Sequence, residues 1–330
     1  MPKQPSPSRT PGLQPRGATH QAARLEELGA KASAYIDNAK AENTRRSYRS
    51  DWADFTAWCE KYRRPSMPAS PDTVAYYLAD RSQDLKTSTL QRRLSTIAEA
   101  HRAAGVESPT RQAQVRYVWA GICREKGVAQ SHMKPTLTKH IREMVEHLPD
   151  SLLGVRDRAL ILLGYAGAMR RSELVGLDVT DLAIAEEGLV VVIRKSKTDQ
   201  VGVGRKIGIP YGEHPETCPV RAVQAWIDDA DIDEGPLFRS VNKHGDVSDR
   251  RLSDQVVADV VKRSLLAAGK SAKKYAAHSL RAGLITQAAM AGVSERAIQD
   301  QSGHKSLAVM RRYIRDGSLF RENAAAKVGL

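Results

Sequence analysis

Five side chains in the second half of this 330-residue chain are suited to handling a phosphodiester. Two are guanidinium groups, two are imidazoles and one is a phenol. Fixed cations and hydrogen-bond donors stabilise the charge that develops on phosphate oxygens, and an activated tyrosine hydroxyl can attack phosphorus. The set therefore predicts an enzyme that cuts and rejoins DNA through a tyrosine. Its members are Arg170, His278, Arg281, His304 and Tyr313.

Arg170 follows an apolar run that we interpret as a buried helix, within the sequence AGAMRRSELVGL at 166–177. A guanidinium fixed at such a helix–turn junction can bind two oxygens of one phosphate, and Glu173 could hold it in orientation. Taken alone the pair is weak evidence. An arginine and a glutamate three residues apart usually form a surface ion pair.

The other four residues lie in two short motifs, each with an ordinary structural alternative. His278 and Arg281, in HSLR, are three residues apart and so share one side of a helical turn, but a surface histidine often lies beside an arginine. His304, in GH, precedes Tyr313 by nine residues. Tyr313 is expected on a short helix, where a tyrosine is most often packed in a core. Only the joint pattern favours chemistry.

The charge of the chain favours a polyanionic partner. The formal net charge is +13. Residues 1–135 contain 22 Lys and Arg against 13 Asp and Glu, whereas residues 136–330 contain 29 against 25. Because basic side chains that neutralise phosphates release condensed counterions, such an excess drives binding to nucleic acid. Double-stranded DNA is the predicted partner, and the excess is concentrated toward the amino terminus.

Several classes of site and compartment are disfavoured by the sequence. The three cysteines form no C-x-x-C pair and have no histidine at ligand spacing, so we predict neither a disulfide framework nor a metal site. No nucleotide-binding G-x-x-x-x-G-K-[ST] motif occurs, and we expect no cofactor. The longest apolar run, 159–169, falls short of the roughly 20 residues that span a bilayer. We predict a cytoplasmic, nucleoid-associated protein with no membrane partner.

The length of the chain indicates more than one domain. Residues 1–20 are basic, rich in proline and nearly without apolar side chains, so we predict a disordered tail. Residues 21–128 show helical periodicity and are predicted to form a first domain. Residues 129–136 are a predicted linker, and residues 137–330 a second domain.

In the first domain the apolar stripes predict a helical core that includes Trp52, Trp58 and Trp119. Ser70-Pro71-Asp72 predicts a helix start, since serine can cap free amides and proline suits the first turn. The polar faces of two helices could lie in a major groove, where arginine reads guanine, although ordinary solvated surfaces remain the alternative. The candidate DNA-binding residues are Thr44, Arg45, Arg46, Arg49, Thr89, Gln91, Arg92 and Arg93.

The second domain is predicted to be mixed. Helices are expected near 138–148 and 155–165, followed by a β-hairpin with strands at 188–193 and 203–209 around the turn RKSKTDQ. The fold class is therefore mainly α with a small β-sheet. Further helices are expected at 253–268, 279–291, 294–301 and 306–314.

The joint pattern resembles the tyrosine recombinase (phage integrase) family. RRSEL, a lysine in a hairpin turn, HSLR, and GH with a tyrosine nine residues later match that family over residues 136–320, and the two-domain layout is most similar to its Cre-type members. The resemblance implies an all-helical, SAM-like core-binding domain followed by an α+β catalytic domain. It also implies that Arg170 and Arg281 hold the scissile phosphate, that His278 and His304 donate hydrogen bonds to it, and that Tyr313 is the nucleophile.

The resemblance further assigns a general acid. Lys197, in the turn sequence SKT, matches the family's catalytic lysine and would protonate the leaving 5′ oxygen. Lys195 competes for this role, because turns of this kind vary in length and one sequence does not fix the register. Free tyrosine has a pKa of about 10, so Tyr313 needs a proton acceptor, for which His278 is the candidate.

Two positions depart from the family pattern without removing a charge. Ala-Gly-Ala-Met replaces the more usual Thr-Gly-Leu before Arg170, and His304 stands where Cre-type members have tryptophan. The implied function is site-specific recombination or integration through a 3′-phosphotyrosine, without metal or ATP. A homotetramer would act on two paired copies of a specific DNA site, with accessory proteins as a further open partner class. The alternatives are a type IB-like topoisomerase and an inactive DNA-binding accessory protein.

Overall fold

The chain divides into two compact units, Met1–Gln130 and Ser131–Leu330, which we call the first and the second unit. The predicted tail 1–20 lies outside the described residues, as do residues 129–132 of the predicted linker. The computed structural model describes residues 24–32, 34–35, 41–128, 133–196, 199 and 202–318.

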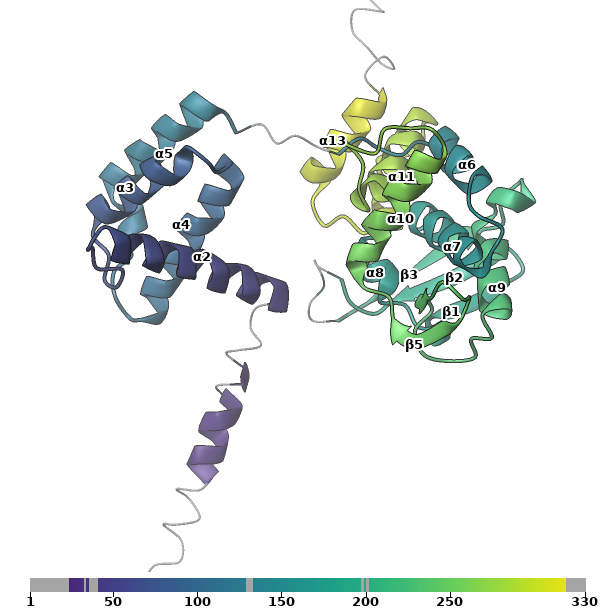
Figure 1. Ribbon diagram of the computed structural model, residues 1–330, viewed down its shortest axis with the longest axis horizontal. Coiled ribbons are helices and arrows are strands. Elements are labelled where there is room, and N and C mark those ends of the chain that lie inside the picture. Colours follow the sequence, from purple (N-terminus) through teal and green to yellow (C-terminus); the bar gives the residue numbers. More distant parts are fainter. Residues whose placement is uncertain are drawn as a thin grey trace, which may run out of the picture. The chain divides into compact units, whose positions relative to one another are not determined.

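Between residues 41 and 128 the first unit is a bundle of helices without a strand (Figure 1). The predicted helix start is confirmed, because the hydroxyl of Ser70 accepts the amide of Thr73 at 3.1 Å and Pro71 is the first helical residue. The elements are α2 (Glu42–Lys61), α3 (Pro71–Ser82), α4 (Thr87–Ala103), the 3₁₀ turn η1 (Pro109–Arg111) and α5 (Ala113–Lys126).

The core of the first unit is built from aromatic and aliphatic side chains on the inner faces of these helices. Phe55 and Tyr77 are buried and meet edge to face, with ring centroids 5.0 Å apart. Trp58 is buried too, while Trp52 and Trp119 are half-buried and pack against this core. The prediction that the three tryptophans belong to the core is confirmed.

The second unit combines helices with two small sheets, so the predicted mainly helical fold with a small sheet is confirmed. Its three-stranded antiparallel sheet has the order β1-β2-β3, and Val191 of β2 pairs with Ile207 of β3. The elements are α6 (Thr138–Glu146), α7 (Leu152–Ala166), α8 (Arg171–Val175), η2 (Val179–Asp181), β1 (Leu182–Ala185), β2 (Gly188–Ile193), β3 (Arg205–Pro210), η3 (Pro215–Thr217), α9 (Pro219–Asp229), β4 (Arg239–Val241), β5 (Val247–Arg251), α10 (Asp254–Ala267), α11 (His278–Met290), α12 (Glu295–Ser302) and α13 (Leu307–Ser318).

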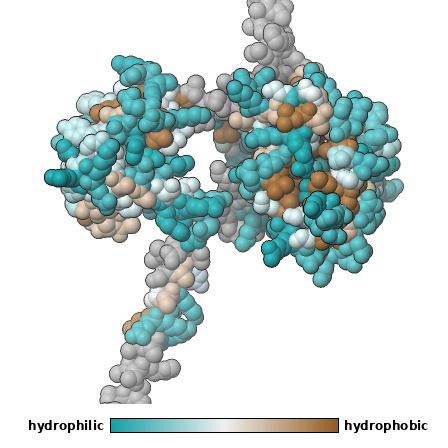
Figure 2. Space-filling model, viewed as in Figure 1, coloured by the Kyte–Doolittle hydropathy of each residue, from teal (hydrophilic) through white to brown (hydrophobic). Residues whose placement is uncertain are grey.

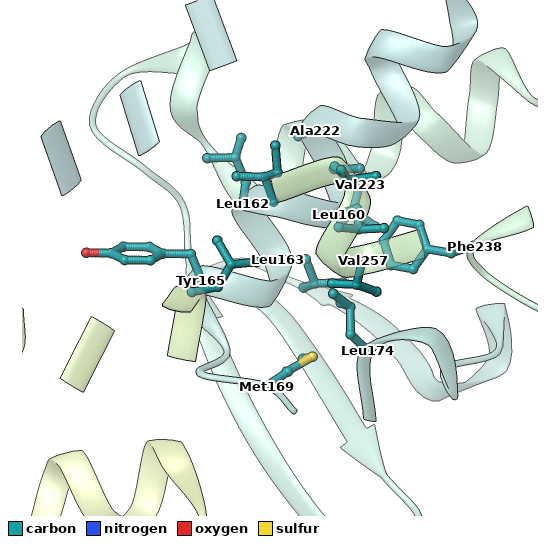
Figure 3. Close-up of a cluster of buried hydrophobic side chains, with 14 of the residues drawn as sticks. Leu160, Leu162, Leu163, Tyr165, Met169, Leu174, Ala222, Val223, Phe238 and Val257 are labelled. Carbon is teal, nitrogen blue, oxygen red and sulfur yellow. The ribbon is translucent and has the colours of Figure 1, made fainter. Parts of the chain in front are cut away.

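Helix α7 lies at the centre of the second unit's core. Leu160 and Leu163 are fully buried, and the view in Figure 3 shows them among side chains of α8, α9 and α10. The ring of Tyr165 points its hydroxyl away from this cluster, where the hydroxyl is 2.8 Å from that of Thr138. Residues 159–166 of the predicted apolar run therefore lie in a buried helix, whereas residues 167–169 form the turn that follows it. No helix among the described residues has the length and apolarity to cross a bilayer.

The predicted hairpin is present, but β3 begins later than expected. Gly202 and Gly204 adopt positive φ angles of 80° and 73°, which end the extended conformation before Arg205. The carboxylate of Asp199 accepts the backbone amides of Gly202, Val203 and Gly204, at 2.7 Å for the last. This local turn chemistry replaces the first residues of the predicted strand.

Candidate active site

Arg170 lies between α7 and α8, directly after the turn that ends α7. Ala168 in that turn has a φ of 46°, a left-handed conformation that reverses the chain. The amide of Arg170 donates to Oε2 of Glu173 at 3.0 Å, and its Nη1 donates to Oε1 of the same carboxylate. Glu173 is 3% exposed. The carboxylate of this ion pair is therefore buried, whereas the spacing alone suggested an ion pair on the surface.

Arg281 is almost completely enclosed, with 1% of its surface exposed. Its Nη1 donates to the carbonyl of Ala168 at 2.6 Å, so the turn before Arg170 also fixes the second arginine. Burial, together with the nearby charge of Arg170, lowers the pKa of Arg281 to about 9. The guanidinium is still charged at neutral pH and lies in a region with excess positive charge.

His304 is brought to Arg281 by the turn after α12. Nη2 of Arg281 is 3.0 Å from Nδ1 of His304, and the hydroxyl of Ser302 is 2.8 Å from the same nitrogen. Burial lowers the pKa of His304 to about 3, with a further contribution from Arg281. The imidazole is therefore neutral at physiological pH, and a neutral imidazole can donate one hydrogen bond.

Tyr313 lies between the two histidines. Its hydroxyl is 2.7 Å from Nε2 of His278, and its ring centroid is 5.8 Å from that of His278 and 6.4 Å from that of His304. His278 is exposed at the start of α11, and Tyr313 is half-buried on α13. The structure thus brings together all five residues that the sequence analysis started from.

Helix α13 is held on α11 by a small apolar cluster. Met310 is fully buried against Ile285, Ala289 and Ile298, and Tyr313 packs against the same cluster. The hydroxyl of Thr286 donates to the carbonyl of Tyr313 at 3.4 Å. The ring of Tyr313 thus contributes to packing while its hydroxyl contacts His278, and its role as the nucleophile stays a prediction.

The structure adds Arg205 of β3, which the sequence analysis did not select. Its Nη2 lies 3.7 Å from Oε2 of Glu173, and its Nη1 donates to the carbonyl of Gln301 at 3.0 Å. A signal was present in the sequence: β3 alternates, so Arg205 shares the inward face with Ile207 and Ile209. An arginine on the buried face of a strand needs an acidic or carbonyl partner. We call Arg170, Glu173, Arg205 and Arg281 the arginine cluster.

The predicted general acid, Lys197, lies outside the described residues. Lys195 is exposed after the end of β2. Its side chain passes close to Gly202, since a Cβ atom at that glycine would lie 3.4 Å from Cε of Lys195. The choice between the two lysines stays a prediction. Among the described residues, no three or more His, Cys, Asp or Glu side chains are grouped so that they could hold a metal ion.

The candidate DNA-binding residues on α2 lie in its amino-terminal half, where Arg46 and Arg49 are exposed. Arg45 donates to Glu42, Arg46 donates to Asn43, and the side chain of Arg49 is 76% exposed. Thr44 is half-buried. Figure 2 shows a largely hydrophilic surface on the visible face of the first unit. DNA contact by this group stays a prediction.

On α4 the candidates are more strongly engaged within the protein. Arg92 donates to both oxygens of Asp51, at 2.7 and 2.9 Å, while 48% of its side chain stays exposed. Arg93 is only 13% exposed and donates to Asp54 and to the hydroxyl of Tyr77. The remaining two candidates, Thr89 and Gln91, are half-buried and exposed, respectively.

Comparison with known proteins gives matches to both units. Residues 134–318 match the phage integrase family, and residues 33–107 match the phage integrase, N-terminal SAM-like domain. An integrase/recombinase xerD homolog from Selenomonas ruminantium is 39% identical over 303 residues, which are 91% of this chain and 89% of the relative. Recombinase cre of Escherichia phage P1 is 25% identical over 299 residues, covering 84% of this chain and 85% of the relative.

A solved structure has a similar fold. The integrase of transposon Tn1549, in complex with transposon right end DNA, aligns with a TM-score of 0.61 at 16% identity. The alignment covers 90% of this chain and 98% of that chain. At this identity the likeness concerns the fold, which comprises the helical first unit and the mixed second unit.

Proposed function

The chain belongs to the phage integrase family of tyrosine recombinases, and we propose that it cuts and rejoins DNA through a covalent bond to Tyr313. The observation that carries this proposal is the 2.7 Å contact between the Tyr313 hydroxyl and Nε2 of His278, beside the bonded pair of Arg281 and His304. A phenol, a proton acceptor and a buried cation are thereby within reach of one phosphate.

Cleavage begins with loss of the tyrosine proton. The hydroxyl of Tyr313 donates its proton to Nε2 of His278 as the phenolic oxygen attacks phosphorus. The new bond joins this oxygen to the 3′ phosphate, and the bond from phosphorus to the 5′ oxygen of the next nucleotide breaks. The geometry supports this step, because the proton has less than one hydrogen-bond length to travel.

The arginines and His304 act on the charge that develops during attack. As the phenolic oxygen approaches, negative charge grows on the non-bridging oxygens of the phosphate, and preorganised cations there stabilise the transition state more than the ground state. Arg170 is held by Glu173, and Arg281 by the carbonyl of Ala168, so both are oriented before DNA arrives. His304 adds a neutral donor.

The leaving 5′ oxygen needs a proton, and Lys197 is the proposed donor, with Lys195 as the alternative. The product is a 3′-phosphotyrosine and a free 5′ hydroxyl. Because the phosphotyrosine bond conserves the energy of the phosphodiester, a 5′ hydroxyl from another strand can attack it and release Tyr313. Cutting and joining each exchange one phosphate ester for another, so neither step consumes ATP or needs a metal ion to balance.

The proposed substrate is double-stranded DNA that carries a specific recombination site. Exchange between two duplexes requires one cut in each of two strands per site, so two paired sites use four tyrosines. We therefore propose a homotetramer on two sites. The first unit contributes a basic helical surface for binding, through exposed side chains such as Arg46 and Arg49.

Trapping the covalent intermediate tests this function. Sheared and nicked genomic DNA from the source organism is incubated with the protein, and SDS-resistant adducts are isolated and sequenced to recover the site. We expect wild-type protein to form the adduct on a nicked duplex of that site and Tyr313→Phe to form none while still binding the duplex. If wild-type protein forms no adduct, the remaining interpretation is an inactive DNA-binding accessory protein.

A second arm separates recombination from relaxation. A supercoiled plasmid with two copies of the recovered site is compared with one that carries a single copy. A recombinase yields deletion or inversion products from the two-site plasmid, whereas a topoisomerase relaxes both plasmids and rearranges neither. Relaxation without rearrangement contradicts the proposal.

A further inference from the structure

We propose that Arg205 is a positioning residue for strand cleavage, which holds the turn that presents His304 and offsets the negative charge of Glu173. The inference rests on the proposed function of the Tyr313 site. Arg205 belongs to β3, whereas the other members of the arginine cluster belong to the α8 and α11 regions. Arg205 therefore connects the sheet to the two helical parts of the site.

The contact with the turn after α12 is close. Nη1 of Arg205 donates to the carbonyl of Gln301 at 3.0 Å. Gly303 ends α12 with a φ of 64°, and a Cβ at this position would lie 2.6 Å from Nε of Arg205. The guanidinium thus occupies the space against which the turn packs, and glycine is required there both for backbone conformation and for this approach.

The same turn delivers His304. Gln301 bonds through its side-chain amide to the carbonyl of Ala166 at 2.8 Å, and the side-chain amide of Gln299 donates to the carbonyl of His304 at 2.8 Å. Two anchors therefore hold the turn, Arg205 on β3 and the end of α7. Loss of the Arg205 anchor would leave His304 free to shift relative to Arg281.

The charge of the cluster gives Arg205 a second role. Three guanidinium groups, of Arg170, Arg205 and Arg281, surround one buried carboxylate, Glu173. The excess of two positive charges matches the two negative charges of a phosphodiester under attack by a phenolate. Without Arg205, Glu173 would cancel one of the two remaining cations. Nη2 of Arg205 is buried and has no hydrogen-bond partner among the described residues, which leaves its interaction with Glu173 at 3.7 Å mainly electrostatic.

A purely structural arginine would behave differently from a positioning residue. If Arg205 only joined β3 to α12, its removal would lower stability, and any loss of cleavage would follow the loss of folded protein. The fold-loss in cleavage rate caused by neutralising Glu173 would then multiply with the fold-loss caused by removing Arg205. If the two charges are linked, however, neutralising both Glu173 and Arg205 restores the excess of two positive charges. The double variant then cleaves faster than the product of the two single losses predicts.

The experiment measures single-turnover cleavage of the nicked duplex by Arg205→Gln, Arg205→Lys, Glu173→Gln and the double variant Glu173→Gln/Arg205→Gln. Lys206→Ala is the matched control, because Lys206 is the next residue on β3 and is exposed. Duplex affinity and the midpoint of thermal unfolding are measured for each. We expect Arg205→Gln to slow cleavage about 10- to 100-fold, less than the roughly 100- to 1,000-fold cost of removing a preorganised donor that touches the reacting group, with affinity unchanged within about threefold.

Three results support the inference together: partial recovery with Arg205→Lys, a double variant less impaired than the product of the single losses, and wild-type cleavage by Lys206→Ala. Wild-type cleavage by Arg205→Gln overturns it, as do strictly multiplicative losses or a loss explained by unfolding. Should wild-type protein form no adduct, the proposed function fails and this inference fails with it. An inert Arg205 in an active enzyme overturns this inference alone.

Discussion

Both units gather arginines around acidic side chains, but the balance of charge differs. In the first unit, two aspartates of α2 accept bonds from three arginines of α3 and α4. Asp51 is 3% exposed and is bound by Arg92, while Asp54 is bound by Arg81 and Arg93. We call these five residues the aspartate network. The hydrogen bond from Arg92 to Asp51 raises the pKa of Arg92, so folding favours the charged form of this guanidinium.

In the arginine cluster of the second unit, three guanidinium groups share the single carboxylate of Glu173. Burial lowers the pKa of Arg205 and of Arg281, and the charge of Arg170 lowers both further. Folding therefore disfavours these cations. Removal of an arginine that is bonded to a buried carboxylate leaves that carboxylate short of a partner, whereas arginines in larger excess over carboxylates form a site that is incomplete without an anion. The difference predicts which substitutions affect stability and which affect chemistry.

The largest expected effect concerns Arg281. Arg281→Met keeps much of the side-chain volume but removes the charge, and we expect at least about a 100-fold loss in single-turnover cleavage. Stability should change little, because relief of repulsion with Arg170 offsets the lost bond to the carbonyl of Ala168. Cleavage of the nicked duplex and thermal unfolding of the same preparation measure the two quantities. A large fall in stability with cleavage retained would reverse the assignment of the arginine cluster.

The aspartate network should give the opposite result. Arg93→Met leaves Asp54 with one arginine fewer in a partly buried setting, so we expect a loss of about 1–3 kcal/mol in the free energy of unfolding. Cleavage at saturating duplex should stay near the wild-type rate. Denaturant titration of the whole chain measures the stability change through tryptophan fluorescence, to which three tryptophans of the first unit and Trp226 of the second contribute.

Arg49→Met is the matched control for Arg93, since its side chain is 76% exposed. Its effect on unfolding should stay within about 0.5 kcal/mol. Because Arg49 is one of the candidate DNA-binding residues, its loss should lower duplex affinity, and the loss of one phosphate contact reduces the slope of log affinity against log salt by about 1. Equal loss of stability in both variants would show that the aspartate network contributes nothing specific.

Local patterns in the sequence were sufficient for much of the fold. The apolar run of α7 and the β-branched run GLVVVI each predicted an element whose side chains are buried, and β2 has the predicted bounds, Gly188–Ile193. Both are continuous apolar runs, which indicate elements buried on more than one face, and their local composition alone is enough to recognise them.

Elements that depend on distant partners were not predicted. Strand β5, with the sequence VSDRR, is mostly exposed and has no apolar alternation, and it forms by pairing with β4. Helix α9 was missed for a different reason, because its start signal, Pro219 at the first helical position, is local and present in the sequence. Short, polar strands carry too little burial to be recognised without their partner.

In the candidate site, the residue types and short motifs were predictable, but the hydrogen bonds that hold these side chains in place were not. The contact from Arg281 to the carbonyl of Ala168 spans 113 positions, and the contact from Arg205 to Gln301 spans 96. No local spacing encodes such bonds. Alternation with Ile207 and Ile209 marks Arg205 as inward-facing, but its distant partners, the carboxylate of Glu173 and the carbonyl of Gln301, are not visible in the local sequence.

An effect that is absent at neutral pH and grows with acidification tests the neutral state of His304. The unfolded chain has a histidine pKa near 6.5, and the folded chain holds the pKa of His304 at about 3. Between these values only the unfolded chain binds the proton, so protonation favours unfolding. The contribution of His304 to stability is complete above pH 6.5 and falls as the pH drops toward 3.

Thermal unfolding of wild-type protein and His304→Gln between pH 8 and pH 4 isolates this contribution, because all other titrating groups are common to both. The wild-type midpoint should fall more steeply with decreasing pH, by no more than the uptake of one proton, and the two curves should run parallel above pH 7. Parallel curves over the whole range would mean that His304 is protonated as readily in the folded chain as in the unfolded one. The excess charge of the arginine cluster would then fail to reach the imidazole, and the contrast with the aspartate network would be confined to the guanidinium groups.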